Sequence, residues 1–313
     1  MAVTTPQPPS IRRQRPRTGE RLIVRGLFLC AVLSIAATVG IIAVLAADTV
    51  KFFSETSIWR FFTGTEWAPV SVGAGAGGTY GVLPLLNGTV MIGLGALAVG
   101  LPLGLATAIY LSEYASSRVR GTLKPILEIL AGIPTVVVGF FALEFVTPTL
   151  LRPLFGEQRV FIFNAASGSI AVGLMILPII ASISEDAMRA VPSSLREAAY
   201  GLGSTKRQVA LRVVVPAALS GISASVILGL SRAVGETMAV SIAAGNTAKT
   251  TFNFFTSIQT LTAAIAQIVG GEAAAGSVRY NALFAIGSTL FVLTLAMNLL
   301  SARIVRRFRQ VYA

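Results

Sequence analysis

Long uncharged apolar runs dominate this chain and leave few folds open to it. Charge-free windows cover residues 26–47, 68–112, 160–184, 213–231 and 280–302. Runs of about 18 apolar residues or more are typical of membrane-spanning helices, because a helix satisfies its own backbone hydrogen bonds in lipid. A hydrophobic content of 54% and a mean hydropathy of +0.77 also indicate an integral membrane protein rather than a soluble domain.

Six membrane-spanning helices follow from these runs. The window 68–112 is longer than one span needs and begins with a glycine-rich loop, so its helix is placed at 85–111. A further candidate, 125–151, is apolar apart from Glu128 and Glu144 and contains a break at Gly132 and Pro134. The uncharged but polar segment 250–271 is interpreted as an outer loop with a short amphipathic helix near 257–269. The sequence therefore predicts an all-α integral membrane protein with six transmembrane helices.

The distribution of Lys and Arg predicts the orientation of these helices. With six spans, 18 of the 25 basic residues fall on one side of the membrane, in segments 12–25, 118–124, 189–212 and 303–309, and 6 fall on the other. Cytoplasmic loops carry the excess of Lys and Arg, so both termini are expected in the cytoplasm. The predicted organisation is a basic disordered cytoplasmic tail (1–20), a first transmembrane helix with an outer loop (21–81), a five-helix core (82–305) that includes the cytoplasmic loop 185–212, and a basic tail (306–313).

Composition argues against several other functions. The net charge of +12 could suggest nucleic-acid binding, but most of the bases flank spans and serve orientation. Cys30 is the single cysteine and there is no histidine, so no disulfide framework, metal site or other cofactor is expected. The glycine-rich stretch 73–78 lacks the Lys-Ser/Thr of a phosphate-binding loop. ATP hydrolysis would therefore require a separate chain.

The polar segment 185–212 carries the most specific pattern in the sequence. Two pairs at capping-box spacing and two glycines divide it, namely Ser194 with Glu197, Thr205 with Gln208, and Gly201 and Gly203 between them. This order predicts a short helix that starts at the first pair, ends at the glycines and is followed by a second helix.

The centre of this segment resembles a motif of bacterial ABC-importer permeases, the EAA loop. Glu197-Ala198-Ala199 is followed by Gly203 and by an apolar run that ends in Pro216, with valines where the family usually has Ile and Leu. The resemblance implies a type I ABC-importer permease fold. It also implies that Glu197, Ala198, Ala199 and Gly203 form a coupling helix that docks on a cytoplasmic ATPase. An ordinary amphipathic loop helix is the alternative.

Further stretches are similar to the C-type permease subunit of the bacterial high-affinity phosphate ABC importer. They lie at 77–84, 109–114, 130–139, 182–187, 190–192 and 231–240. The resemblance implies a cell-membrane protein that moves inorganic phosphate inward as half of a heterodimer. Its implied partners are an A-type permease subunit, cytoplasmic ATPase subunits and an extracytoplasmic phosphate-binding protein.

Arg232 and Glu236 are the candidate residues of the translocation pathway. They are four residues apart in the fifth predicted span and would share one helix face. Arg232 would lie about 24 Å along this helix from Pro216. Charged residues at membrane depth usually face a bundle interior or a water path, and the guanidinium fork suits phosphate-like oxyanions. An internal salt bridge, or an arginine that reaches to the outer interface, is the structural alternative.

Three other functions remain as alternatives. A permease for sulfate or molybdate would use Arg232 equally well. A secondary transporter driven by an ion gradient would usually show inverted repeats with broken helices in both halves, and no convincing pair is present. An intramembrane enzyme is disfavoured, because the chain has no histidine and no nucleophile–base pair at helical spacing.

Overall fold

The computed structural model describes residues 18–69, 78–271, 273–274 and 276–308. The chain divides into two units, 1–47 and 48–313, which are described separately. The described part of the first unit consists of residues 18–47 of helix α1 (Thr18–Glu55), whose last residues belong to the second unit. Within α1, Leu22–Glu55 is apolar enough to span a membrane, with a mean hydropathy of 2.7. The expected tail 1–20 and loop 73–78 lie almost wholly outside the described residues. The same is true of residues 309–313 of the expected C-terminal tail.

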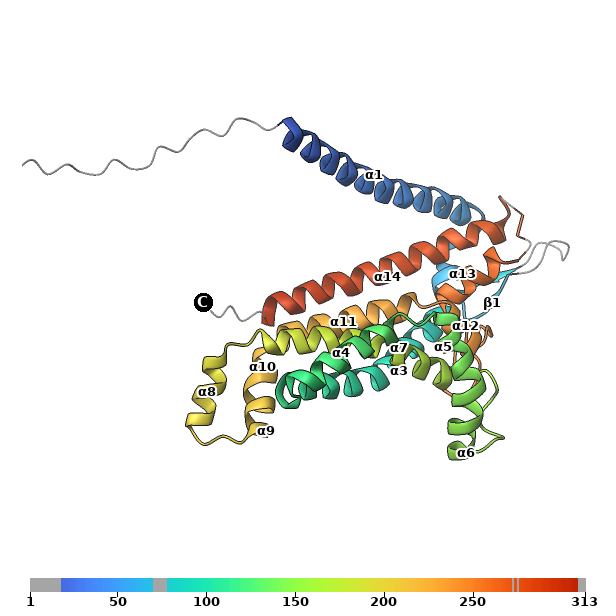
Figure 1. Cartoon of the computed structure of the whole chain (residues 1–313). Helices are drawn as coiled ribbons and strands as arrows, with labels where there is room; N and C mark the ends of the chain where they lie inside the picture. Colours follow the sequence, from blue (N-terminus) through green and yellow to red (C-terminus); the bar gives the residue numbers. More distant parts are fainter. Residues whose placement is uncertain (1–17, 70–77, 272, 275, 309–313) are drawn as a thin grey trace, which may run out of the picture. The chain divides into compact units, whose positions relative to one another are not determined.

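The second unit is built almost entirely of helices (Figure 1). In chain order, with η for π-helical segments, it contains α2 (Ile58–Thr63), β1 (Trp67–Ala68), β2 (Thr79–Tyr80), α3 (Leu83–Ile109), η1 (Tyr110–Tyr114), α4 (Ser117–Ala131), α5 (Thr135–Phe141), η2 (Ala142–Leu151), α6 (Arg152–Phe155), α7 (Ala165–Arg189), α8 (Ser193–Gly201), α9 (Lys206–Val209), η3 (Ala210–Val214), α10 (Val215–Ala217), α11 (Leu219–Gly235), α12 (Met238–Ala243), α13 (Leu261–Val269) and α14 (Val278–Phe308). The strands pair antiparallel, with Trp67 opposite Tyr80.

Helices α3, α7 and α11 form the centre of this unit. They lie against one another, with α14 along α11 and α4 along α7. Helices α8 and α9 lie at one end of this bundle, and α12, α13 and β1 lie at the other (Figure 1). The central core is aliphatic and includes Ile92, Val172, Ile176 and Ile180, all almost completely buried. This arrangement fixes the loop between α7 and α11 at one end of three packed helices.

Glycines allow α3 and α7 to approach closely. Gly100 and Gly104 are one helical turn apart on α3, the spacing by which small residues bring helix backbones together in membranes. A methyl group at Gly100 would lie 2.7 Å from Cγ1 of Ile176 and 2.8 Å from the carbonyl oxygen of Gly173. Because one of these neighbours is backbone, the contact has no room for a side chain.

The predicted all-α membrane fold is confirmed, and two of its spans are interrupted. Among the described residues, five helices are long and apolar enough to cross a membrane. A sixth span results if the pair Lys206–Ala217 and Leu219–Gly235, which meet at an angle of 71°, counts as one. The predicted continuous span 213–231 is therefore wrong in its first part. Pro216 lies just after the π-helical turn η3. Its ring nitrogen has no hydrogen to donate, so it interrupts the regular hydrogen bonding of the helix.

The predicted span 125–151 is broken where the sequence placed the break, but its apolar helix begins and ends later. Helix α4 ends at Ala131, and a new helix starts at Thr135 after Pro134, so the apolar helix of this region is Thr135–Phe155. The break itself lies at the Gly132 and Pro134 that the sequence marked. The next predicted span, 160–184, is displaced to Ala165–Arg189, because Asn164 caps the helix by accepting from the backbone N–H of Ser167 at 2.7 Å. The short helix expected near 257–269 is present as α13, Leu261–Val269.

The glycine contact between α3 and α7 generates a stability prediction. Replacing Gly100 with Ala should destabilise the protein by about 1–3 kcal/mol, because the added methyl overpacks against the α7 backbone. Gly121→Ala in α4 is the matched control. A methyl there meets nothing within 4 Å and should stabilise the helix by up to about 1 kcal/mol. Thermal unfolding of the detergent-purified protein measures both changes, and an unaltered midpoint for Gly100→Ala would contradict the close packing.

Candidate functional site

The loop between α7 and α11 begins later than its polar sequence indicated. Helix α7 continues to Arg189, so Glu185 is a helical residue and not the start of a loop. Helix α8 starts at Ser193 with Pro192 at the N-cap and no side-chain cap, so the predicted capping box of Ser194 and Glu197 is wrong. The backbone of Pro192 has φ −56°, and this fixed torsion of proline favours a helix start without help from a side chain.

The second half of the loop follows the sequence prediction. Gln208 accepts from the backbone N–H of Thr205 at 2.8 Å, and its own N–H donates to the Thr205 hydroxyl at 3.4 Å, which completes the predicted capping box. Helix α8 ends at Gly201, and Gly203 adopts φ +80°, a left-handed conformation that favours glycine. The short helix between two breaks is therefore confirmed.

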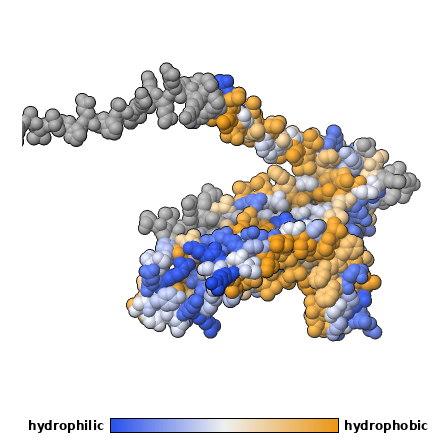
Figure 2. Space-filling model, in the orientation of Figure 1, coloured by the Kyte–Doolittle hydropathy of each residue, from blue (hydrophilic) through white to orange (hydrophobic). Residues whose placement is uncertain are grey.

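Helix α8 has an inner and an outer face, and the structure divides the predicted coupling residues between them. Glu197 and Ala198 are exposed, whereas Ala199 packs with Leu195 on a core of α3, α7 and α9 residues. Tyr200 is 43% exposed and Leu202, at the end of the helix, is 88% exposed. Figure 2 shows polar surface gathered at this end of the molecule, beside the apolar sides of the helices. The outer face, defined as Glu197, Ala198, Tyr200 and Leu202, is the part of α8 that another chain could contact.

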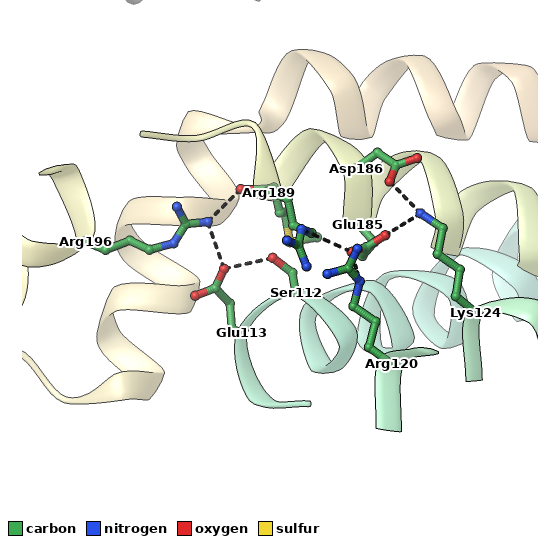
Figure 3. A network of polar contacts seen from close by, with 9 residues as sticks. Ser112, Glu113, Arg120, Lys124, Glu185, Asp186, Arg189 and Arg196 are labelled. Carbon is green, nitrogen blue, oxygen red and sulfur yellow. Dashed lines mark hydrogen bonds and ion pairs between the residues drawn. The ribbon is translucent and has the colours of Figure 1, made fainter. Parts of the chain in front are cut away.

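Arg196 fastens the inner face of α8 to two other helices (Figure 3). Its Nη2 donates to Oε1 of Glu113 at 3.1 Å and to the carbonyl oxygen of Met188 at 2.7 Å, and its Nη1 donates to the carbonyl oxygen of Val191. Glu113 belongs to η1 at the end of α3, and it also accepts from the Ser112 hydroxyl at 2.8 Å. The guanidinium thus joins α8 to the ends of α3 and α7.

A second charged cluster joins α4 to α7. The fully buried Glu185 lies 3.0 Å from Nε of Arg120, 2.8 Å from Nζ of Lys124 and 3.7 Å from Nε of Arg189, and Asp186 binds Lys124 at 2.6 Å. Burial lowers the pKa of Lys124, but its hydrogen bonds to Asp186 and Glu185 outweigh this effect and raise the pKa above its ordinary value. The ammonium form is therefore favoured at neutral pH.

Sequence reasoning missed both clusters. Only the four-residue spacing of Glu185 and Arg189 on a helix could have indicated a charged face, whereas Arg120, Lys124 and Glu113 come from distant positions in the chain. Helix α4 contains no buried residue, so ion pairs contribute much of its attachment to α7.

The structure separates Arg232 from Glu236. The expected shared helix face is wrong, because α11 ends at Gly235 and Glu236 has an extended backbone. Among the described residues no ion pair joins the two. Glu236 is 9% exposed, its Oε1 accepts from the backbone N–H of Ala239 at 3.3 Å, and its carbonyl oxygen accepts from the Thr262 hydroxyl at 2.8 Å. Glu236 is therefore bound within the local fold. Arg232 is exposed on the last turn of α11, and its guanidinium forms no ion pair with Glu236.

Comparison with known proteins agrees with this architecture. Residues 100–310 match the model of the family described as "Binding-protein-dependent transport system inner membrane component". The chain is 36% identical over 290 residues to "Probable ABC transporter permease protein YqgH" of Bacillus subtilis, covering 92% of this chain and 90% of the relative. It is 31% identical over 308 residues to "Phosphate transport system permease protein PstC" of Mesorhizobium japonicum, covering 91% of each chain.

Two solved structures share the fold. A chain of a bacterial alginate ABC transporter in complex with an alginate-bound periplasmic protein superposes with a TM-score of 0.61 at 16% identity, over 92% of this chain and 96% of that one. A chain of the MetNI methionine ABC transporter superposes with a TM-score of 0.53 at 21% identity, over 73% and 94%. These similarities identify the type I ABC-importer permease fold.

Together these findings define an ABC-importer permease, a multi-pass protein of the bacterial inner membrane. The chain belongs to the family of binding-protein-dependent transport system inner membrane components, and its sequence is of the PstC type.

The buried carboxylate generates a second stability prediction. Glu185→Gln should destabilise the protein by about 1–3 kcal/mol, because Arg120 and Lys124 would lose their buried counter-charge while keeping some access to water. Asp186→Asn is the matched control. That side chain is 62% exposed, so its loss should cost at most about 1 kcal/mol. Thermal unfolding in detergent distinguishes the two, and equal losses would show that burial of Glu185 has no energetic consequence.

Proposed function

We propose that this chain is a permease subunit of an ATP-driven importer for inorganic phosphate. The observation that carries the proposal is the similarity to proteins named phosphate transport permeases along 91% of the chain. The proposed assembly contains an A-type permease subunit as the second half of the pathway, cytoplasmic ATPase subunits and an extracytoplasmic phosphate-binding protein. Both termini and α8 are proposed to face the cytoplasm, in accordance with the distribution of Lys and Arg.

The outer face of α8 is the proposed contact with the ATPase. A nine-residue helix with an inner face packed on α3, α7 and α9 presents the remaining face to any partner. Leu202 is the most exposed apolar side chain of this loop, and the polar Glu197 of α8 is exposed as well. Exposed apolar residues rimmed by polar ones are typical of protein interaction sites.

The contact with the ATPase is testable by substitution on this surface. Leu202→Asp should weaken the complex by about 2 kcal/mol, because an apolar anchor in an interface would become a charge that must lose its water. The measurement is the amount of ATPase that co-purifies with the assembled permease. Phe252→Asp is the matched control. It changes an 85% exposed side chain between α12 and α13, at the other end of the bundle, and should leave ATPase binding unchanged. Normal ATPase binding by Leu202→Asp would refute this docking surface.

Arg232 is the proposed anion-binding residue of the pathway. It is exposed on α11, next to the interruption at Gly235, and among the described residues no carboxylate neutralises it. Interrupted helices at membrane depth are typical of substrate sites in transporters. A guanidinium can replace part of the hydration of a phosphate with several hydrogen bonds.

Phosphate uptake tests both the substrate and the residue. Arg232→Gln should lower uptake of radiolabelled phosphate about tenfold or more, because a hydrogen bond from a charged donor contributes about 1.5–3 kcal/mol. Arg232→Lys should retain part of the activity. Glu236→Gln should retain most of it, because the amide oxygen can still accept from Ala239. Uptake is normalised to the assembled complex in the membrane.

The same assay separates the alternatives. Near-normal uptake by Arg232→Gln would remove Arg232 from the pathway. Competition of phosphate uptake by excess sulfate or molybdate, with transport of those ions, would show a permease for another oxyanion. Uptake that continues without ATP and follows an ion gradient would show a secondary transporter.

A further inference from the structure

The inner side of α8 is attached by charge as well as by apolar packing. The side chains of Arg196 and Glu113 are only 19% and 6% exposed, so their 3.1 Å ion pair is largely shielded from water. Such a pair is screened much less than a surface pair. Arg196 also binds the carbonyl oxygens of Met188 and Val191, where α7 ends.

The following helix contacts the same place on α3. The Nζ atom of Lys206, the first residue of α9, lies 5.1 Å from the ring centroid of Tyr114, one residue after Glu113. A cation at this distance from an aromatic ring is attracted to its face. Both short helices of the loop are therefore fastened to η1, the π-helical end of α3.

Helix α4, which follows η1, is also attached to α7 by ion pairs. Its Arg120 and Lys124 bind the buried Glu185 of α7. Figure 3 shows the two clusters next to each other, with Glu113 and Arg196 on one side and Glu185 with its bases on the other. The ends of α3 and α7 and the beginnings of α4 and α8 are thus connected through ion pairs.

Arginine is the residue type that this arrangement requires. One planar guanidinium donates to three acceptors on two elements, whereas a lysine ammonium is a point charge on a flexible stem. Truncation of Arg196 would release α8 from η1 and leave the shielded Glu113 without its ion-pair partner. It would not alter the outer face of α8.

We propose that Arg196 is a positioning residue that makes α8 and the ends of α3 and α7 move as one unit when the ATPase displaces α8. This role rests on the proposed coupling function of α8. Arg196 does not itself contact the ATPase or the substrate. Loss of Arg196 should therefore uncouple ATP hydrolysis from transport without releasing the ATPase.

The test uses the assembled complex in lipid nanodiscs, in a Cys30→Ser background. Spin labels at Ser194→Cys on α8 and Ser117→Cys at the start of α4 report the distance between the two elements, both sites being exposed. With Arg196 present, we expect one narrow distance that is the same with and without ATP. With Arg196→Gln, we expect a broader distribution that changes with ATP, and the phosphate transported per ATP hydrolysed should fall about fivefold or more.

Two further variants make the result specific. Arg196→Lys keeps the charge and should give an intermediate ratio of transport to hydrolysis. Arg118→Gln removes a base from the exposed first turn of α4 and should leave both the distance and the ratio unchanged. ATPase co-purification should be normal in all three variants.

Several results would overturn the proposal. It fails if the label distance changes with ATP while Arg196 is present, if Arg196→Gln leaves both distance and ratio unaltered, or if Arg196→Gln loses the ATPase. Failure of the proposed function would look different from failure of this proposal. In that case the complex that retains Arg196 would itself lack phosphate uptake or ATPase binding.

Discussion

The close contact between α3 and α7 is the constraint on which the rest of the second unit depends. Lipid offers helices no hydrophobic reason to associate, so they associate through van der Waals contact, hydrogen bonds and small residues. Gly100, Gly104 and Gly173 supply that contact by removing side chains where the two backbones meet. Because the pair is held along its length, the two helix ends that carry Glu113 and Glu185 are brought side by side.

Those two carboxylates then decide how α4 and α8 are attached. A buried carboxylate is costly unless bases satisfy it, and each of the two binds bases from a separate element. Glu185 binds Arg120 and Lys124 of α4, and Glu113 binds Arg196 of α8. Helix α4 contains no buried residue and depends largely on these ion pairs, whereas α8 combines its ion pair with apolar packing of Leu195 and Ala199.

The proposed ATPase contact and the proposed anion-binding residue lie on helices of one continuous chain segment. The loop that contains α8 and α9 continues through η3 and α10 into α11, and α11 carries Arg232 on its last turn. The bend of 71° before α11 and the interruption after Gly235 leave a helix of 17 residues between two breaks. This helix links the proposed ATPase contact on α8 to Arg232, the proposed pathway residue.

The sequence by itself determined the class of fold and the local geometry of the loop. Long apolar runs required membrane helices, Pro134 and Gly132 marked a break, and Gly203 with the Thr205 and Gln208 pair defined the end of one short helix and the start of the next. These features depend on residues within a few positions of one another, so local rules suffice to predict them.

Only the tertiary structure decided which charges meet. Arg232 and Glu236 have the spacing of a helical pair, yet the helix ends between them, whereas Arg196 and Glu113 are 83 positions apart and lie 3.1 Å from each other. The predicted capping box is likewise absent, because α8 has Pro192 rather than Ser194 as its N-cap and so starts two residues earlier than predicted. Ion pairs between distant elements depend on how helices pack, and packing depends on side chains along the whole length of α3 and α7, which no local spacing encodes.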